Sequence, residues 1–410
     1  MINFKPFKST YLFLFLVFIF QLISCAQEPK LKLSQQINND DIVKTGAEQT
    51  ELYLHLLKGK KVAVVGNQTS VIAKRRFGSA ASDFVHLVDS LLSLDIQIQK
   101  VFAPEHGFRG KADAGEVVKD GVDSKTGLPI VSLYGKQKKP SSKQLEGIDV
   151  VIFDIQDVGA RFYTYISTLH YVMEACAELG ISLLILDRPN PNGHYIDGPV
   201  LEMEYTSFVG MHKVPVVYGL TIGEYGQMIN GEKWLLNGIQ CDLKVIPLGN
   251  YTHQTAYRLP VKPSPNLPNA ESINLYPSLC FFEGTNVSAG RGTELQFQIY
   301  GSPFLNKSFF SFTPQPNEGA KDPKFKNTIC YGEDLRGTKQ LSQLDLSYLL
   351  KAYQQDYSQD FFNSFFTKLA GTTKLQQQIE QGLNEREIRK TWEKDLAVFK
   401  VIRSKYLIYK

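Results

Sequence analysis

Three segments of the chain gather acidic, arginine and tyrosine side chains directly after short apolar runs. The apolar runs end near residues 103, 153 and 186, and the polar segments that follow are residues 104–110, 154–165 and 187–193. Carboxylates, guanidinium groups and aromatic rings together suit the cleavage of a glycosidic bond. In that reaction one carboxylic acid protonates the leaving oxygen, while a second carboxylate acts as nucleophile or activates water.

The acidic and basic members of these segments also have structural explanations. Glu105 suits a helix cap or an ion pair with Arg109. Asp154 and Asp187 suit the backbone amides of tight turns. Arg161 suits a role as the partner of a buried carboxylate. These explanations stay open for each residue taken alone.

Three polar strand ends together are hard to explain by structure alone. His106 suits a buried core position as well as a ligand contact, and Tyr163 and Tyr165 suit packing at a helix start. The convergence of the three segments nevertheless predicts a polar pocket.

A fourth segment, residues 283–294, is rich in glycine and carries an arginine between two glutamates. The simplest structural explanation is a glycine-rich turn exposed to solvent. We favour a contribution to the pocket, because binding sites often form where two domains meet.

Several motifs of other enzyme classes are absent from the sequence. Residues 66–70 read Gly-Asn-Gln-Thr-Ser where a dinucleotide-binding protein would carry GxGxxG. The chain also has no GxxxxGK[ST] phosphate loop, no GxSxG elbow, no HExxH and no CxxC. We therefore expect neither a cofactor nor a metal site. A metal-assisted hydrolase that uses His106 and nearby acids remains a third hypothesis.

The polar segments need a scaffold, and the hydrophobic pattern supplies one. Short apolar runs at 62–65, 96–103, 130–134, 150–154, 181–186 and 243–247 alternate with helical patterns at 48–57, 84–94, 163–179 and 221–236. This alternation is typical of a parallel sheet covered by helices on both faces. We predict a doubly wound α/β domain over residues 48–265, with the polar segments at the carboxyl ends of its strands.

A change of character follows this domain. Residues 259–277 hold five prolines, which argues against a regular element and marks a domain junction. Beyond it we expect a smaller α+β domain over residues 266–410. Its strands are predicted at 281–282 and 295–300, and one long helix is predicted at 385–403.

The start of the chain predicts the compartment. A basic start, an apolar run and the sequence Leu-Ile-Ser before Cys25 match a bacterial lipoprotein signal over residues 1–24. The alternative is a plain signal peptide with an incidental cysteine. Residues 25–47 are then a tether between the lipid on Cys25 and the folded part. We expect an exported protein anchored in the cell envelope, at the outer membrane or facing the periplasm.

The composition is that of an ordinary globular protein. Apolar residues make up 43% of the chain and charged residues 21%. The formal net charge of +4 is too small to suggest nucleic acid as a partner.

The long motifs resemble one known family, the NamZ-type exo-β-N-acetylmuramidases. The resemblance covers residues 50 to 410 and rests on segments 67–70, 104–110, 153–165, 187–191 and 283–294. It implies a Rossmann-like N-terminal domain and a smaller C-terminal domain. It also implies removal of N-acetylmuramic acid from the non-reducing end of peptidoglycan chains or fragments, in cell-wall turnover and recycling.

The resemblance assigns provisional roles by position. Glu105 becomes the leading candidate for a catalytic carboxylate and Glu294 the second, with Asp154, Asp157 and Asp187 as rivals. N-acetylmuramic acid carries a lactyl carboxylate that a guanidinium binds in bidentate fashion. The further candidates for substrate binding are His106, Arg109, Arg161, Tyr163, Tyr165, Asn190 and Arg291.

A non-catalytic alternative uses the same pocket. An exported lipoprotein that binds cell-wall sugars for uptake or sensing would need no turnover. Clustered carboxylates favour the enzyme, because their mutual repulsion raises pKa values and suits proton transfer. Sequence alone leaves open whether the reaction retains or inverts the anomeric configuration.

Overall fold

The computed structural model describes residue 1 and residues 42–74, 83–109, 120–358 and 360–410. The chain divides into two units, residues 1–42 and residues 43–410, and the second unit holds the fold discussed below. Cys25, the predicted signal segment and most of the predicted tether lie outside the described residues. None of the helices in the described ranges is long and apolar enough to cross a bilayer.

A seven-stranded sheet forms the centre of the first half of this unit. Its order is β5-β6-β4-β1-β7-β8-β9, and only β5 runs antiparallel to its neighbour. The strands are β1 Lys61–Gly66, β4 Gln97–Ala103, β5 Gly121–Val122, β6 Pro129–Ser132, β7 Val150–Asp154, β8 Ser182–Leu186 and β9 Leu243–Ile246. Counted in chain order, the six parallel strands read 3-2-1-4-5-6, which is the order of the Rossmann fold.

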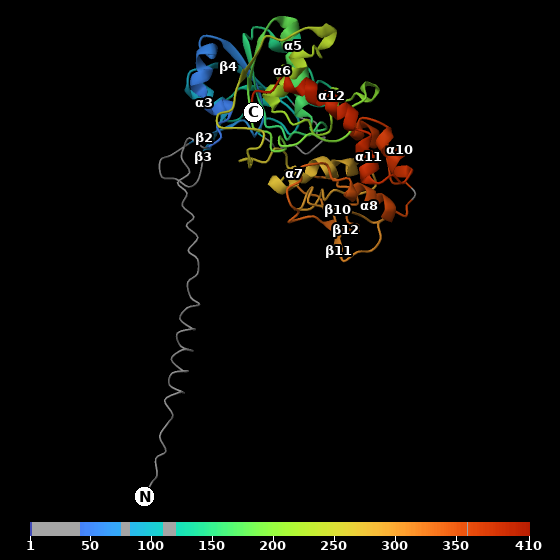
Figure 1. The fold of residues 1–410 in the computed structure, drawn as a ribbon. Coiled ribbons are helices and arrows are strands. Elements are labelled where there is room, and N and C mark those ends of the chain that lie inside the picture. Colours follow the sequence, from blue (N-terminus) through green and yellow to red (C-terminus); the bar gives the residue numbers. More distant parts are fainter. Residues whose placement is uncertain (2–41, 75–82, 110–119, 359) are drawn as a thin grey trace. The chain divides into compact units, whose positions relative to one another are not determined.

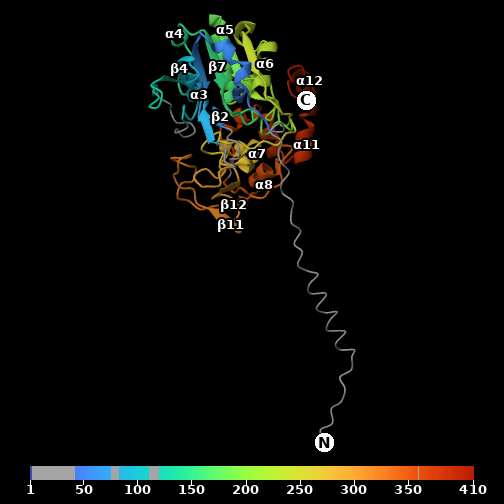
Figure 2. The ribbon, with the colours of Figure 1, turned by 90° about the vertical axis from the view of Figure 1, so that its left-hand side faces the viewer.

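Both faces of the sheet are buried, as the continuous apolar runs predict. Along β1, Val62 and Val64 pack in one core cluster, whereas Ala63 and Val65 pack in the other. Helix α3 (Leu87–Ser93) covers the first face. Helices α5 (Tyr165–Leu179) and α6 (Ile222–Gly231) cover the second (Figures 1 and 2). The predicted doubly wound α/β fold is confirmed.

Two predicted helices of this half were wrong in detail. The pattern at 84–94 begins with strand β3 (Asp83–His86), which pairs with β2 (Val71–Lys74), and only then becomes α3. His86 caps that helix by accepting a hydrogen bond from the Val88 amide at 3.2 Å. Strand pairing with β2, the preceding strand, therefore overrides the local helical pattern. The pattern at 48–57 forms three short pieces: η2 Gly46–Glu48, η3 Thr50–Leu52 and α2 Leu54–Leu57.

The remaining short elements of this half connect the strands. They are α4 Ser142–Leu145, η4 Met203–Tyr205 and η5 Leu236–Gly238. Helix α6 ends at Gly231, before the end predicted from the pattern at 221–236.

The second half is a smaller α+β arrangement. A three-stranded antiparallel sheet has the order β10-β12-β11. Its strands are β10 Ile299–Ser302, β11 Phe310–Phe312 and β12 Cys330–Asp334. The helices are α7 Ala270–Leu279, η6 Cys280–Gly284, α8 Ser347–Gln355, α9 Phe366–Ala370, α10 Lys374–Glu380, α11 Glu385–Lys390 and α12 Glu393–Ser404.

Four predictions for this half differ from the structure. The strand predicted at 295–300 begins only at Ile299, as β10. Residues 270–277 were expected to be irregular, yet they lie in α7, which tolerates Pro277 close to its end. Phe281 and Phe282 were expected in a strand, but they are buried in η6. The predicted helix 385–403 is interrupted between α11 and α12, where Trp392 turns into the core.

The last residues of the chain return to the first half. The Arg403 Nε donates to the Gly219 carbonyl at 2.9 Å, and the Tyr409 hydroxyl donates to Asp187 at 2.6 Å. Figure 1 shows α12 running from α11 back toward α6. Residues 43–410 form one compact unit, and the end of the chain packs on the first half. The predicted domain boundary at residues 265/266 therefore stays a prediction.

Candidate active site

A cavity of about 370 Å³ lies beyond the carboxyl ends of the parallel strands. One wall comes from the loops after β4 and β7, with Glu105, His106, Tyr163 and Thr164. The other wall comes from α7, η6 and the glycine-rich segment. Its side chains are Tyr276, Glu283, Arg291 and Phe297. Both halves of the sequence are therefore needed to enclose the cavity.

Glu105 lies at the cavity because of the turn that ends β4. The amide of Gly107 donates to the Pro104 carbonyl at 3.0 Å, and both His106 and Gly107 adopt left-handed backbone conformations, with φ of 71° and 77°. A left-handed conformation is costly for a histidine, and such strain gathers at functional sites. The Thr164 hydroxyl, at the start of α5, donates to Oε2 of Glu105 at 2.9 Å.

The second carboxylate in the cavity is Glu283. Nε and Nη2 of Arg291 donate to its Oε1 at 2.8 and 2.6 Å. Burial acts to lower the pKa of Arg291, but the Glu283 carboxylate outweighs it and raises that pKa above its ordinary value. The guanidinium also lies 5.6 Å from the centre of the Phe297 ring. The cavity therefore holds a carboxylate paired with a permanent cation.

Lys324 fixes the loop that carries Glu283. Its ammonium donates to the carbonyls of Phe282 and Val287 at 3.0 Å each, and also to the carbonyl of Thr285. Burial lowers the pKa of Lys324 to about 8. Sequence reasoning missed both Glu283 and Lys324. The available signal for Glu283 was its place at the start of the motif that contains Arg291.

Glu294, predicted as the second catalytic carboxylate, does not line the cavity. Its side chain is exposed to solvent. Gly290 and Gly292 adopt φ of 81° and 79°, and the Thr293 amide closes a turn onto the Gly290 carbonyl at 3.2 Å. The turn directs Arg291 into the cavity and leaves Glu294 outside.

The two tyrosines of the α5 segment have different positions. Tyr163 lines the cavity, and its hydroxyl donates to the Pro263 carbonyl at 2.8 Å. Tyr165 lies behind it, edge to face at 4.9 Å between ring centres, and accepts a hydrogen bond from Asn67 at 2.8 Å. Tyr163 is thus placed to contact a ligand, whereas Tyr165 supports Tyr163.

Arg109 and Arg161, two of the three predicted carboxylate-binding arginines, are engaged elsewhere. Arg109 forms ion pairs with Asp123 at 2.7 Å and Asp89 at 3.2 Å. Arg161 is fully buried, and its guanidinium donates to four backbone carbonyls. Neither lines the cavity.

The acids after β7 and β8 are buried parts of the scaffold. Asp154 pairs with Arg188 through two contacts, at 2.6 and 2.9 Å. Asp187 accepts hydrogen bonds from Thr221, Gly223 and Tyr409 at 2.6 to 2.8 Å. Neither lines the cavity, so the structure separates these rivals from Glu105.

Asn190 also belongs to the scaffold. Its side-chain amide donates to the Leu220 carbonyl at 2.8 Å, and its oxygen accepts from the Asn192 amide at 2.8 Å. It borders a different cavity of about 460 Å³.

Comparisons with known proteins identify the family of the chain. Family models for the N-terminal and C-terminal parts of exo-β-N-acetylmuramidase NamZ match residues 62–271 and 274–409. The chain belongs to the NamZ family. A relative from Bacillus subtilis strain 168, the peptidoglycan β-N-acetylmuramidase NamZ, is 39% identical over 387 residues, which cover 87% of this chain and 89% of the relative.

Solved structures of similar proteins share the fold. A DUF1343 family protein from Bacteroides fragilis NCTC 9343 is 45% identical, with a TM-score of 0.81. A second DUF1343 family protein from the same organism is 28% identical, with a TM-score of 0.74. Each alignment covers 90% of this chain and 99% of the solved chain.

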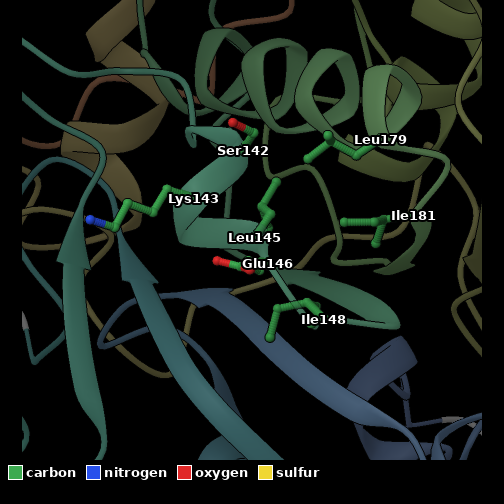
Figure 3. A pocket seen from close by; sticks show the side chains of 8 residues that line it. Ser142, Lys143, Leu145, Glu146, Ile148, Leu179 and Ile181 are labelled. Carbon is green, nitrogen blue, oxygen red and sulfur yellow. The ribbon is translucent and has the colours of Figure 1, made fainter.

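A third hollow of this NamZ-family member lies away from the site. It has a volume of about 490 Å³ and surrounds α4, with Leu145, Ile148 and Ile181 on its apolar side (Figure 3). Ile148 and Ile181 precede β7 and β8, so this hollow lies at the amino ends of the strands. Ligands of Rossmann-like sheets bind at the opposite edge, where Glu105 lies.

Asp157 predicts a pH dependence of stability. Burial raises its pKa to about 6, although Tyr218 and the Gly159 amide donate to Oδ2. Its Oδ1 is buried and has no partner among the described residues. Asp157 does not line the cavity, so its titration should act on stability.

The direction in which the free energy of unfolding changes with pH follows from proton binding. Between pH 4 and 6 the native state binds this proton and the unfolded state does not, so the free energy of unfolding falls as pH rises. We expect the free energy of unfolding of the wild type, relative to that of Asp157→Asn, to fall by about 2 kcal/mol from pH 4 to pH 7. Urea unfolding at several pH values measures it, and parallel profiles for the two proteins would contradict it.

Proposed function

We propose that this protein is an exo-β-N-acetylmuramidase that releases N-acetylmuramic acid from the non-reducing end of peptidoglycan fragments. The observation that carries the proposal is the cavity itself. It joins Glu105 from the Rossmann-like part with Glu283 from the second half, beside an arginine and aromatic rings. Membership of the NamZ family supports the substrate class.

The two carboxylates suit different roles. Hydrolysis breaks the bond between the anomeric carbon and the leaving oxygen, which takes a proton from an acid, and a water hydroxyl ends on the carbon. Glu283 is held by two hydrogen bonds from the Arg291 guanidinium, which orient its carboxylate, and we assign to it the role of base or nucleophile. Glu105 accepts from the neutral Thr164 hydroxyl, and we assign proton donation to it.

Arg291 is the arginine that suits the lactyl group of N-acetylmuramic acid. Glu283 engages its Nε and Nη2, which leaves Nη1 for a second carboxylate. Arg109 and Arg161 are engaged away from the cavity. We therefore infer that selection for muramic acid depends on Arg291.

Hydrolysis of para-nitrophenyl β-N-acetylmuramide tests the proposed function. The matching N-acetylglucosaminide lacks the lactyl carboxylate. It should react at least about 100-fold more slowly, because the Arg291 guanidinium is then left without a carboxylate from the substrate. If no muramide is hydrolysed, the enzymatic proposal fails. Binding of muramic acid saccharides in calorimetry without any turnover would then favour the non-catalytic binding lipoprotein.

Glu283 and Glu294 form a matched pair for mutagenesis. We expect Glu283→Gln to lower kcat by about 100-fold or more, because it removes a charge that stabilises the transition state. Glu294→Gln makes the same chemical change outside the cavity and should retain activity. Initial rates on the nitrophenyl muramide measure both. The reverse ranking would restore Glu294 as the second catalytic carboxylate.

We also propose that the protein is exported and anchored by a lipid on Cys25. The support is the signal pattern of residues 1–24. The Cys25→Ser variant should lose incorporation of labelled fatty acid in a bacterial host. Equal labelling of both proteins would contradict the anchor.

A further inference from the structure

The cavity has a closed end and an open mouth. At the closed end Tyr163, Leu267, Tyr276 and Phe297 are buried. Tyr134, Phe208 and Val209 line the same cavity and are half-buried, as are Glu105, Thr164, Glu283, Arg291 and Phe365. An enzyme that removes a terminal sugar holds that sugar at the closed end. The rest of the saccharide then leaves past half-buried side chains, of which Phe208 is one.

Phe208 is held firmly at this mouth. The Ser167 hydroxyl donates to its carbonyl at 2.7 Å. The flanking residues Ser207 and Gly210 exchange two backbone hydrogen bonds, at 2.9 and 3.0 Å. The Tyr171 ring stacks on the Phe208 ring at 6.3 Å between centres, with 17° between the planes. A ring fixed in this way is a pre-organised surface for a ligand.

Helix α5 sets the separation between Phe208 and Glu105. Thr164, at its start, contacts Glu105, whereas Ser167 and Tyr171 contact Phe208. Seven residues of α-helix separate Thr164 from Tyr171, a rise of about 10 Å. The same helix therefore places Glu105 at the reacting bond and Phe208 farther along the leaving saccharide.

A positive charge accompanies the ring. Nζ of Lys138 lies 4.2 Å from the centre of the Phe208 ring, a cation–π geometry. The neighbouring Lys139 is neutralised by Glu174 and Glu178, each at 2.7 Å. Lys138 forms no ion pair with any carboxylate in the described ranges. Its charge therefore remains available to an anionic ligand.

We infer that Phe208 and Lys138 form a subsite for the leaving saccharide, which recognises a carboxylate carried beyond the reacting bond. This inference rests on the proposed function. In peptidoglycan the sugar that leaves is followed by another muramic acid, which carries either a free lactyl carboxylate or a stem peptide with carboxylates of its own. Both sources supply the same chemical group to Lys138. The subsite makes the enzyme favour longer fragments.

Three substrates and three variants test the subsite. The short substrate is para-nitrophenyl β-N-acetylmuramide. The long ones are a muramic-acid-terminated tetrasaccharide without peptides and the same tetrasaccharide with a stem peptide on its internal muramic acid only, so that the terminal lactyl carboxylate stays free. Lys138→Met removes the charge and Lys138→Arg keeps it. The matched control is Lys143→Met on α4, which borders the distant hollow shown in Figure 3.

The measured quantity is the ratio of kcat/KM on the long substrate to kcat/KM on the short one. We expect Lys138→Met to lower this ratio about tenfold, mainly through KM, because a charge-assisted contact is lost. Lys138→Arg should restore the ratio and Lys143→Met should leave it unchanged. Raising the salt concentration should lower the ratio of the wild type but not that of Lys138→Met.

The outcomes separate the subsite from the proposed function. A tenfold effect on the peptide-free tetrasaccharide assigns the lactyl carboxylate, and an effect only on the peptide-bearing one assigns the stem peptide. An unchanged ratio in Lys138→Met overturns the subsite while hydrolysis itself stands. If the wild type hydrolyses neither substrate, the proposed function fails. Calorimetry of the tetrasaccharides with wild type and Lys138→Met then decides the subsite, which equal affinities would overturn.

Discussion

Replacing Glu105 by glutamine is expected to lower kcat by about 10²- to 10⁴-fold, the usual contribution of a positioned general acid or base. Glutamine preserves the shape of the side chain and still accepts the Thr164 hydrogen bond, so the cavity keeps its form. It cannot carry a transferable proton. Rates on the nitrophenyl muramide, with circular dichroism to check folding, measure the effect.

A matched control separates chemistry from a general loss of charge. Glu146 is exposed and lies by α4, at the amino ends of the strands (Figure 3). Glu146→Gln makes the same change far from the cavity and should retain full activity. If Glu105→Gln keeps more than about a tenth of the wild-type rate, Glu105 is not the catalytic acid. The role would then pass to another group at the cavity.

Replacing Arg161 by leucine is expected to lower the free energy of unfolding by at least about 4 kcal/mol. The guanidinium donates to the carbonyls of Pro199 and Val214 at 2.8 Å and to those of Leu369 and Ala370 at 2.9 and 2.7 Å. Leaving each buried acceptor without a donor costs about 1–3 kcal/mol. The substitution also removes the hydrogen bonds that join α9 to the Rossmann-like half. Two of the four carbonyls lie in that half and two lie in α9.

Urea unfolding at constant pH measures this effect. Arg386→Leu is the matched control, because Arg386 is exposed on α11. A surface change of this kind should stay within about 0.5 kcal/mol of wild type. Equal stability of Arg161→Leu and Arg386→Leu would show that the four hydrogen bonds contribute little. At low temperature, where Arg161→Leu is still folded, its rate of muramide hydrolysis should stay close to that of the wild type, because Arg161 does not line the cavity.

The scaffold was largely predictable because its determinants are local. Apolar runs of β-branched and aliphatic residues predicted all six parallel strands, and the polar segments after β4, β7 and β8 were correctly placed at strand ends. One failure occurred where pairing with another strand decides the local structure. Residues 83–86 became a strand because β2 pairs with them.

The site was only partly predictable. Glu105, His106, Tyr163 and Arg291 were chosen from the sequence and lie together at the cavity. Asp154, Asp157 and Asp187 carry the same chemical group as Glu105 and also lie at or after the end of a buried strand. They are nevertheless buried in the scaffold. Composition and spacing cannot tell a buried carboxylate with donors around it from one that faces a cavity.

The sequence by itself determined the strand ends, the family and the position of Glu105 after β4. Only the tertiary structure decided that Glu283, and not Glu294, is the second carboxylate of the cavity. The physical reason is that left-handed turns at Gly290 and Gly292 set the direction of each side chain. The tertiary structure also decided which arginine faces the cavity, since the candidate arginines have identical chemistry. Arg161 meets carbonyls up to 209 residues away, whereas Arg291 faces the cavity.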